Sequence, residues 1–264
     1  MENNYECLKK VKCFLLDMDG TIYLDDKLFA NVIETLDLMK QKGRIIFLTN
    51  NSSKSKEVYI KKLAKLGINI NDDEIYTSGM ATIDYLNRYY YGKSVYLLGS
   101  TSLEKEFLDN NITINDVNPD LIVMGYDTDL TYQKLVKFTN FLHEDKYFIA
   151  THPDINCPAF PYYVVDIGAM LAMIKASTNK SPNLIIGKPY KTMGENIMEK
   201  YNLKNDEIAM IGDRLYTDIA FANNCNFVSI LVLSGESTLE DYKKSSQKCD
   251  IVVAQISNLR EYLK

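Results

Sequence analysis

Four clusters of polar side chains each follow a short apolar run in this sequence of 264 residues. The apolar runs resemble strands buried on both faces of a parallel sheet, and the carboxyl ends of such strands form the ligand-binding edge of an open α/β fold. The clusters, in chain order, are Asp17 with Asp19, Thr49 with Asn50, Lys188, and Asp213 with Asp218. We expect them to meet around one divalent cation and one phosphoryl group.

The acidic pair Asp17 and Asp19 directly follows the apolar run 11–16. Buried carboxylates that lie close together repel each other, and their pKa values rise. Mg²⁺ relieves this repulsion, because it prefers carboxylate and phosphate oxygens. We therefore predict a Mg²⁺ site formed by Asp17 and Asp213. With its charge shielded by the cation, Asp17 could attack phosphorus and form an aspartyl phosphate.

The remaining polar residues supply the other parts of such a reaction. Asp19 suits general acid and base catalysis, first on the leaving oxygen and then on the attacking water. Gly20 permits a tight turn that brings backbone N–H groups to the phosphate. The hydroxyl of Thr49 and the N–H of Asn50 could bind phosphate oxygens, and Lys188 would offset the negative charge.

Each cluster alone is common in turns and loops, and only their conjunction at four strand ends is specific. Two other functional classes stay open at this point. One is a phosphoacceptor regulatory domain, which binds Mg²⁺ without turnover, although such domains are much shorter than this chain. The other is a glycosyltransferase with a DxD motif, which would leave Lys188 and Asp213 without a role.

The elements that must position these clusters alternate between strand and helix, which predicts an α/β fold with a parallel sheet. The strands that we expect in this sheet are 11–16, 44–48, 184–186, 208–211, 227–233 and 250–253. The helices that we expect beside them are 31–42, 55–66, 192–201, 217–223 and 256–263. The region between has its own predicted strands and helices. We therefore predict a catalytic core of residues 1–78 and 182–264, with a smaller α/β domain, 79–181, inserted into it.

Composition narrows the class of protein further. The net charge of −5 gives no basic footprint for nucleic acid. Five lysines read as the solvated face of a helix: Lys54, Lys56, Lys61, Lys62 and Lys65. The five cysteines show no CxxC spacing, which fits free thiols in a reducing cytoplasm. No apolar segment is long enough to span a bilayer, so we expect a cytoplasmic protein without membrane or nucleic-acid partners.

The motifs resemble those of the haloacid dehalogenase-like (HAD) superfamily. They read Asp17-Met18-Asp19-Gly20-Thr21, Thr49-Asn50-Asn51, Gly187-Lys188-Pro189 and Gly212-Asp213 through Asp218. The longer strings LLDMDGTIY, FLTNNSSKS and MIGDRLYTDI are similar to the NagD-type and p-nitrophenylphosphatase subfamily, class IIA. The resemblance implies a Rossmann-like three-layer core, Mg²⁺, and hydrolysis of phosphate monoesters of small metabolites, such as sugar phosphates or nucleotide-like compounds.

The resemblance also implies a role for each residue. Asp17 would be the nucleophile and a metal ligand, and Asp19 would be the acid and base and would bind metal through its backbone carbonyl. Asp213 would be the acidic metal ligand, and Asp218 would orient metal-bound waters or the lysine. The residues that would bind phosphate are Thr49, Asn50 and Lys188.

The inserted domain would be a cap over the site, and its loop Thr151-His152-Pro153-Asp154 resembles the cap loop that faces the substrate. His152 and Asp154 could then determine substrate specificity, although a structural loop histidine and a turn aspartate are equally open readings. His152 replaces the asparagine that is often found there. Caps in this subfamily often form dimers, so the resemblance allows a homodimer.

Overall fold

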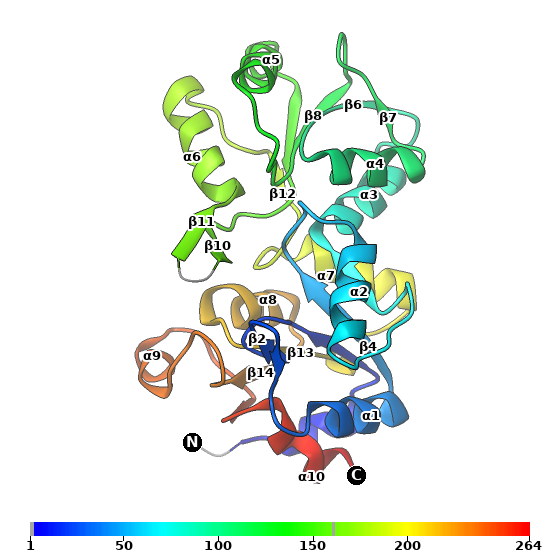
Figure 1. Ribbon diagram of the computed structural model, residues 1–264, viewed down its shortest axis with the longest axis vertical. Helices are drawn as coiled ribbons and strands as arrows, with labels where there is room; N and C mark the ends of the chain where they lie inside the picture. The colour runs from blue at the N-terminus through cyan, green and yellow to red at the C-terminus, as the bar shows by residue number, and fades with distance from the viewer. Residues whose placement is uncertain (1–2, 160–161) are drawn as a thin grey trace. The chain divides into compact units, whose positions relative to one another are not determined.

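The computed structural model describes residues 3–159 and 162–264, which fold into two compact units. The core unit comprises Met1–Thr49, Lys56–Tyr76 and Lys188–Lys264, and the insert unit comprises Asn50–Ser55 and Thr77–Gly187. Both units contain parallel sheets with helices, which confirms the predicted α/β fold class (Figure 1). None of the helices described is both long and apolar enough to cross a bilayer.

The core unit is built on a six-stranded sheet in the order β15-β14-β13-β1-β4-β5. These strands are β1 (Cys13–Leu16), β4 (Arg44–Thr49), β5 (Ile75–Thr77), β13 (Ile208–Gly212), β14 (Val228–Val232) and β15 (Ile251–Val253). Strand β1 is parallel to β13 on one side and to β4 on the other, with Leu15 opposite Met210 and Ile46. The carboxyl ends of these three strands therefore reach the same edge of the sheet.

Helices pack against this sheet because its strand residues alternate between two apolar faces. Phe14 and Leu16 of β1 share one hydrophobic cluster with Leu36 and Met39 of α1. The helices of this unit are α1 (Val32–Lys42), α2 (Lys56–Lys65), α7 (Thr192–Tyr201), α8 (Ala220–Cys225), α9 (Leu239–Lys244) and α10 (Arg260–Leu263). Helices α1 and α10 contact each other (Figure 1). A short hairpin, β2 (Tyr23–Leu24) and β3 (Lys27–Leu28), follows β1.

The insert unit contains a five-stranded sheet in the order β12-β9-β8-β6-β7. Its strands are β6 (Ser94–Leu98), β7 (Thr113–Ile114), β8 (Leu121–Met124), β9 (Tyr147–Ala150) and β12 (Leu184–Ile185), with a separate hairpin of β10 (Asn156–Ala159) and β11 (Tyr162–Val165). Its helices are α3 (Ser78–Tyr89), α4 (Thr101–Asp109), α5 (Tyr132–His143) and α6 (Ile167–Thr178). Phe138 of α5 packs edge-on against Phe148 of β9, at 5.0 Å between ring centres.

One predicted strand belongs to a different sheet from the one expected. The run 184–186 was predicted in the core sheet, but β12 pairs with β9 of the insert unit, with Leu184 opposite Ile149. A run of three apolar residues is compatible with either sheet, so its length could not decide between them. Lys188 thus follows a strand of the insert unit and enters the core unit in the loop before α7.

Several other elements differ from expectation. The predicted helix 217–223 begins as a π-helical turn, Leu215–Ile219, and continues as α8. Strand β5 and helices α3 and α9 were not anticipated, because their sequences are short or mix polar and apolar residues without a clear period.

Candidate active site

Lys188 joins two of the predicted acidic residues in the core unit. Asp17 lies directly after β1, and its N–H donates to the carbonyl of Ile211 at 2.9 Å. The Nζ of Lys188 donates to Oδ1 of Asp17 at 2.8 Å and to Oδ1 of Asp218 at 2.7 Å. Lys188 is only 3% exposed. A lysine so deeply buried needs carboxylate partners, and these two supply them.

Three carboxylates lie around this lysine. Asp17, Asp213 and Asp218 offer oxygens that all lie within 4.8 Å of one another. Burial raises the pKa of Asp17 to about 8; Lys188 opposes this rise, while Asp218 and Asp213 add to it. Burial and the charge of Asp218 likewise raise the pKa of Asp213 to about 7. Burial alone would lower the pKa of Lys188, but the charges of Asp17 and Asp218 outweigh it and raise that pKa.

The acidic cluster has the chemistry of a divalent-cation site. Oδ1 of Asp213 is buried and has no hydrogen-bond partner among the described residues. A buried carboxylate oxygen without a donor is unfavourable unless a cation binds it. One lysine also leaves three clustered carboxylates with excess negative charge. These oxygen donors fit a hard divalent cation.

Asp218 is placed by the π-helical turn after β13 and by a glycine. The N–H of Arg214 donates to Oδ2 of Asp218 at 3.1 Å. A Cβ added to Gly212 would lie 2.4 Å from the Cβ and carboxylate of Asp218, so only glycine leaves room for this side chain. Asp218 therefore packs directly against the end of β13, just before Asp213. There its carboxylate accepts a hydrogen bond from Nζ of Lys188.

A loop that sequence analysis missed holds Asp213 in place. After β14, Ser234 donates its hydroxyl to the carbonyl of Gly20 at 2.7 Å, and the N–H of Glu236 donates to Oδ2 of Asp213 at 2.7 Å. The carboxylate of Glu236 pairs with Nε of Arg214 at 2.9 Å. The signal was present, since Ser-Gly-Glu-Ser is another polar cluster at a strand end.

Gly20 forms the tight turn that was predicted for it. Its own N–H donates to the carbonyl of Tyr23 at 2.8 Å, and the binding of phosphate by N–H groups of this turn stays a prediction. Gly20 lies at φ +80°, and a Cβ there would be 2.4 Å from Oδ2 of Asp213. Glycine is thus required for the turn and for the close approach of Asp213.

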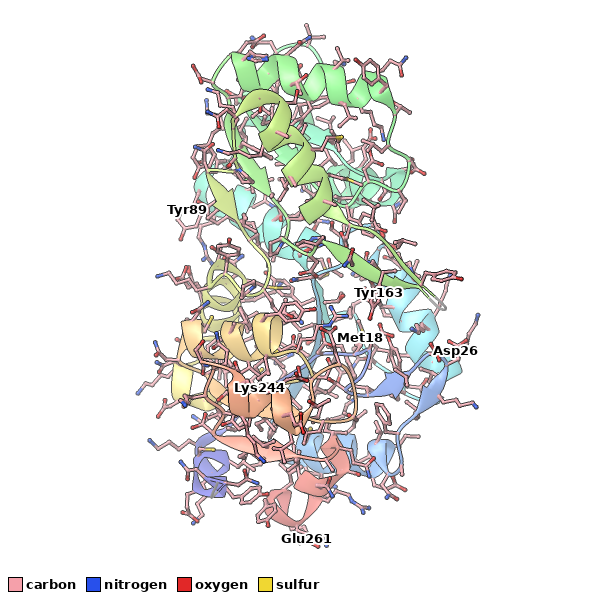
Figure 2. The ribbon with its side chains drawn as sticks, turned by 90° about the vertical axis from the view of Figure 1, so that its left-hand side faces the viewer. Met18, Asp26, Tyr89, Tyr163, Lys244 and Glu261 are labelled. Carbon is pink, nitrogen blue, oxygen red and sulfur yellow. The ribbon has the colours of Figure 1, made fainter. Side chains whose placement is uncertain are left out.

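Asp19 is the most exposed of the predicted catalytic carboxylates, at 58% of its side chain. Lys62 of α2 places Nζ 3.7 Å from Oδ1 of Asp19, and the hydroxyl of Tyr23 lies 3.5 Å from Oδ2. Lys62 therefore has a charged partner in another segment, which the prediction of a solvated helix face did not include. Met18, between the two acidic residues, is buried at 3% exposure (Figure 2).

The second motif is divided between the two units. Thr49 ends β4 in the core unit. Asn50 belongs to the insert unit, where its Nδ2 donates to both carboxylate oxygens of Asp154, at 3.1 and 3.2 Å. The binding of phosphate by Thr49 and Asn50 stays a prediction.

His152 is fully buried in a polar network of the insert unit. Its Nδ1 lies 3.0 Å from the hydroxyl of Thr151 and 3.3 Å from that of Ser78, and its Nε2 lies 3.1 Å from Oδ1 of Asp166. Asp166 is the N-cap of α6. Both ring nitrogens therefore have protein partners, so an influence of His152 on substrate choice would act through these neighbours.

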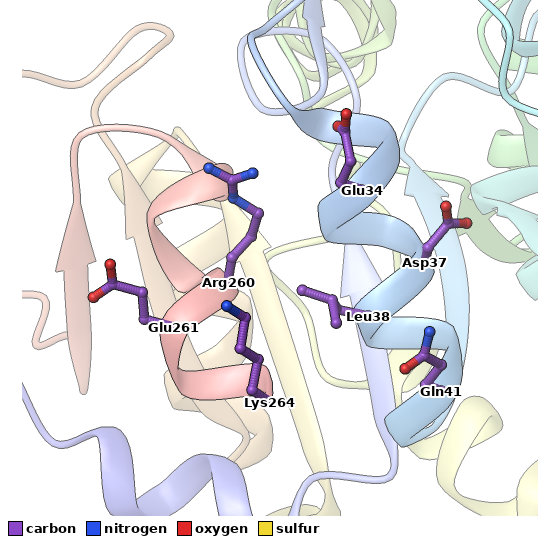
Figure 3. Close-up of a pocket in the computed structure, with 7 residues that line it drawn as sticks. All are labelled: Glu34, Asp37, Leu38, Gln41, Arg260, Glu261 and Lys264. Atoms are coloured by element: carbon purple, nitrogen blue, oxygen red, sulfur yellow. The ribbon is translucent and has the colours of Figure 1, made fainter.

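A separate pocket of the core unit does not contain these groups. It lies between α1 and α10 and is lined by Glu34, Asp37, Leu38, Gln41, Arg260, Glu261 and Lys264 (Figure 3). Its lining mixes charges of both signs and includes none of the residues at the carboxyl ends of the sheet. The acidic cluster with Lys188 is thus the stronger candidate for chemistry.

Comparison with known proteins agrees with this geometry. A family model described as haloacid dehalogenase-like hydrolase matches residues 14–113, and a HAD-hydrolase-like model matches residues 185–259. An acid sugar phosphatase of Staphylococcus aureus strain MRSA252 is 34% identical over 241 residues, which cover 90% of this chain and 93% of that protein. The chain belongs to the haloacid dehalogenase-like hydrolase family.

Solved structures of this family place the chain more closely. The 4-nitrophenylphosphatase of Thermotoga maritima superposes with a TM-score of 0.94 at 41% identity, covering 98% of this chain and 99% of that one. NagD from E. coli K-12 gives a TM-score of 0.86 at 29% identity, covering 94% and 97%. This HAD protein is therefore an enzyme, a NagD-type phosphatase that acts on small phosphorylated substrates. A non-enzymatic phosphoacceptor domain and a glycosyltransferase are no longer alternatives.

Proposed function

We propose that this HAD phosphatase is Mg²⁺-dependent and hydrolyses phosphate monoesters of small metabolites through an aspartyl phosphate on Asp17. The observation that carries the proposal is Lys188, which is buried between Asp17 and Asp218 in a cluster that includes Asp213. Mg²⁺ bound by Asp17, by Asp213 and by the backbone carbonyl of Asp19 would neutralise charge on the carboxylates and the phosphoryl group.

The residues of this chain would then divide the reaction between them. Lys188 would orient Asp17 and, together with the bound cation, favour its ionised form, so that one carboxylate oxygen can form a bond to phosphorus as the ester oxygen departs. Asp19 gives a proton to the departing oxygen and then takes one from the water that cleaves the aspartyl phosphate. Asp218 keeps Lys188 in position. We assign Gly20 to the turn that makes room for Asp213, and phosphate binding to Thr49, Asn50 and Lys188.

The names of the relatives support a substrate class to test first. The S. aureus relative is named an acid sugar phosphatase, and the T. maritima neighbour a 4-nitrophenylphosphatase. We therefore propose sugar phosphates as the first class to test, with nucleotide-like phosphates second. We also propose that the insert, 79–181 in our sequence-based division, is the cap that selects among substrates through His152 and Asp154. The division with residues 1–78 and 182–264 as catalytic core is part of the same proposal.

Two further properties are proposed on indirect grounds. The five cysteines are free thiols, which supports a reducing cytoplasm. Tyr162 and Tyr163 of β11 are 79% and 66% exposed. Such exposed aromatic side chains support association of two copies as a homodimer. Tyr163 is labelled in Figure 2. Sedimentation of the wild type and of a Tyr162→Ser variant would test the dimer.

The proposed reaction is tested by phosphate release from p-nitrophenyl phosphate. Turnover should require Mg²⁺ and should be abolished in Asp17→Asn, whose fold should persist because Lys188 keeps Asp218. Near-normal Mg²⁺-dependent rates in that variant would show that Asp17 is not the nucleophile. A panel of sugar phosphates and nucleoside monophosphates, compared by kcat/KM, would then identify the substrate class.

A further inference from the structure

Lys62 contacts the segment that carries the proposed acid and base. Its Nζ lies 3.7 Å from Oδ1 of Asp19 and 4.0 Å from the centre of the Tyr23 ring. The hydroxyl of Tyr23 lies 3.5 Å from the other carboxylate oxygen of Asp19. The two oxygens of Asp19 thus face two different side chains, one from α2 and one from β2. All three residues belong to the core unit.

This placement separates Lys62 from its neighbours Lys61 and Lys65 on α2, which are exposed, whereas Lys62 is 35% exposed in its side chain. Lys56, at 29%, pairs with Asp72 instead. A lysine that lies over an aromatic ring and beside a carboxylate gives up rotamer freedom that a solvated lysine keeps. The contact therefore restrains both partners, and Tyr23 is itself fully buried.

The backbone around Asp19 is already held by contacts with Tyr23 of the β2–β3 hairpin. Asp19 forms a β-bridge with Tyr23, and the N–H of Gly20 donates to the Tyr23 carbonyl at 2.8 Å. The carboxylate itself is 58% exposed. An exposed carboxylate can rotate freely unless side chains hold it, and proton transfer requires that one of its oxygens be aimed at the leaving oxygen.

We propose that Lys62 is a positioning residue for Asp19, which it orients together with Tyr23 for proton transfer to the leaving group. The proposal rests on the role assigned to Asp19 above. Lys62 acts through Asp19 and not on the substrate. Its loss should therefore matter in proportion to how strongly a substrate needs a proton on its leaving oxygen.

The test compares aryl phosphates of similar size, p-nitrophenyl and phenyl phosphate. Nitrophenolate leaves readily as an anion, whereas phenolate leaves slowly unless it is protonated. We would measure kcat/KM, which includes departure of the leaving group, for the wild type, Lys62→Met, Lys62→Arg and Asp19→Asn. Lys61→Met is the matched control, because it removes the same charge from the adjacent, exposed position of the same helix.

Lys62→Met should lower kcat/KM for phenyl phosphate about tenfold more than for p-nitrophenyl phosphate, a fraction of the full effect of a general acid. Lys62→Arg should restore most of the wild-type ratio, and Lys61→Met should leave it unchanged. Equal losses on both substrates in Lys62→Met, or no loss on either, would overturn the positioning role. If Asp19→Asn also left the ratio unchanged, the proposed acid role of Asp19 would fail, which is a separate result.

Discussion

Glu236 donates its backbone N–H to Oδ2 of Asp213 at 2.7 Å, while Oδ1 of the same carboxylate is buried without a partner among the described residues. The loop after β14 thus binds Oδ2 of Asp213, and Oδ1 is available to a cation. Gly235 makes this possible, because a Cβ there would lie 2.0 Å from Oδ2. The position of this proposed metal ligand thus depends on the loop after β14.

Gly235→Ala should therefore impair cation binding more than folding. The added methyl group cannot coexist with Asp213 in its present position, so the carboxylate must shift. We expect the Mg²⁺ concentration for half-maximal activity to rise about tenfold or more, as when a residue that orients a ligand is lost. Ser234→Ala, which removes a bond to Gly20 without adding an atom, is the milder comparison. An unchanged Mg²⁺ dependence in Gly235→Ala would contradict the coupling.

Lys188→Met should remove activity and destabilise the protein in a pH-dependent way. The change leaves Asp17 and Asp218 buried without their cation, which typically costs about 3 kcal/mol of unfolding free energy when both are ionised. The loss should be smaller at low pH, where the carboxylates can protonate. We expect kcat to fall at least about a hundredfold. Urea unfolding and steady-state rates would measure both effects.

The control for this variant is Lys191→Met. Lys191 pairs with Glu195 at 3.2 Å, but both side chains are largely exposed, at 66% and 47%. Exposed pairs of this kind contribute about 0–1 kcal/mol. A comparable loss of stability in Lys191→Met and Lys188→Met would mean that the buried contacts of Lys188 are not decisive.

Stability without metal should fall as pH rises, and Mg²⁺ should reverse this fall. Burial raises the pKa of Asp17 to about 8 and of Asp213 to about 7, from 3.8 in the unfolded chain. A raised folded-state pKa gives stability that is full below the unfolded value and lost as pH rises through the folded value. Bound Mg²⁺ favours the ionised carboxylates, so its stabilising effect should grow from about pH 5 to about pH 8.

Thermal unfolding with a chelator and with saturating Mg²⁺, measured across this range, would give the difference directly. Asp213→Asn removes one of the two titrating groups and a cation ligand, so the Mg²⁺-dependent difference should largely disappear in it. A Mg²⁺ effect of the same size at both ends of the pH range would show that these carboxylates are already ionised without the cation.

The acidic cluster could be predicted from the sequence because most of its residues follow strands of one parallel sheet. Asp17 and Asp213 follow β1 and β13, which are adjacent and parallel, so their side chains must reach the same edge of the sheet. Lys188 was predicted by the same reasoning, but that reasoning does not apply to it, because the strand before it, β12, pairs with β9 of the insert unit. Lys188 nevertheless belongs to the core unit, because the loop after β12 leads back there.

What the sequence could not predict depends on contacts between side chains. The contact between Lys62 and Asp19 was not predicted, because the partner of this helical lysine lies in another segment of the chain. The N–H of Gly20 donates locally, to the carbonyl of Tyr23, which was not predicted from the sequence. For His152 the sequence left a substrate contact and a structural loop histidine equally open, and its ring is buried among Thr151, Asp166 and Ser78. Such pairings are set by three-dimensional proximity and not by spacing along the chain.

His152→Asn should destabilise the insert unit and change substrate preference. Asparagine is too short to replace the bond from Nε2 to Asp166, and a buried carboxylate that loses a donor costs about 1–3 kcal/mol. Because Asp166 caps α6, whose Gly168 N–H binds the carbonyl of Asp154, the loop around Asp154 should shift. We expect relative rates among sugar phosphates to change more than the rate with p-nitrophenyl phosphate. His143→Asn, at the exposed end of α5, is the control, and equal losses on all substrates would argue against any role of His152 in specificity.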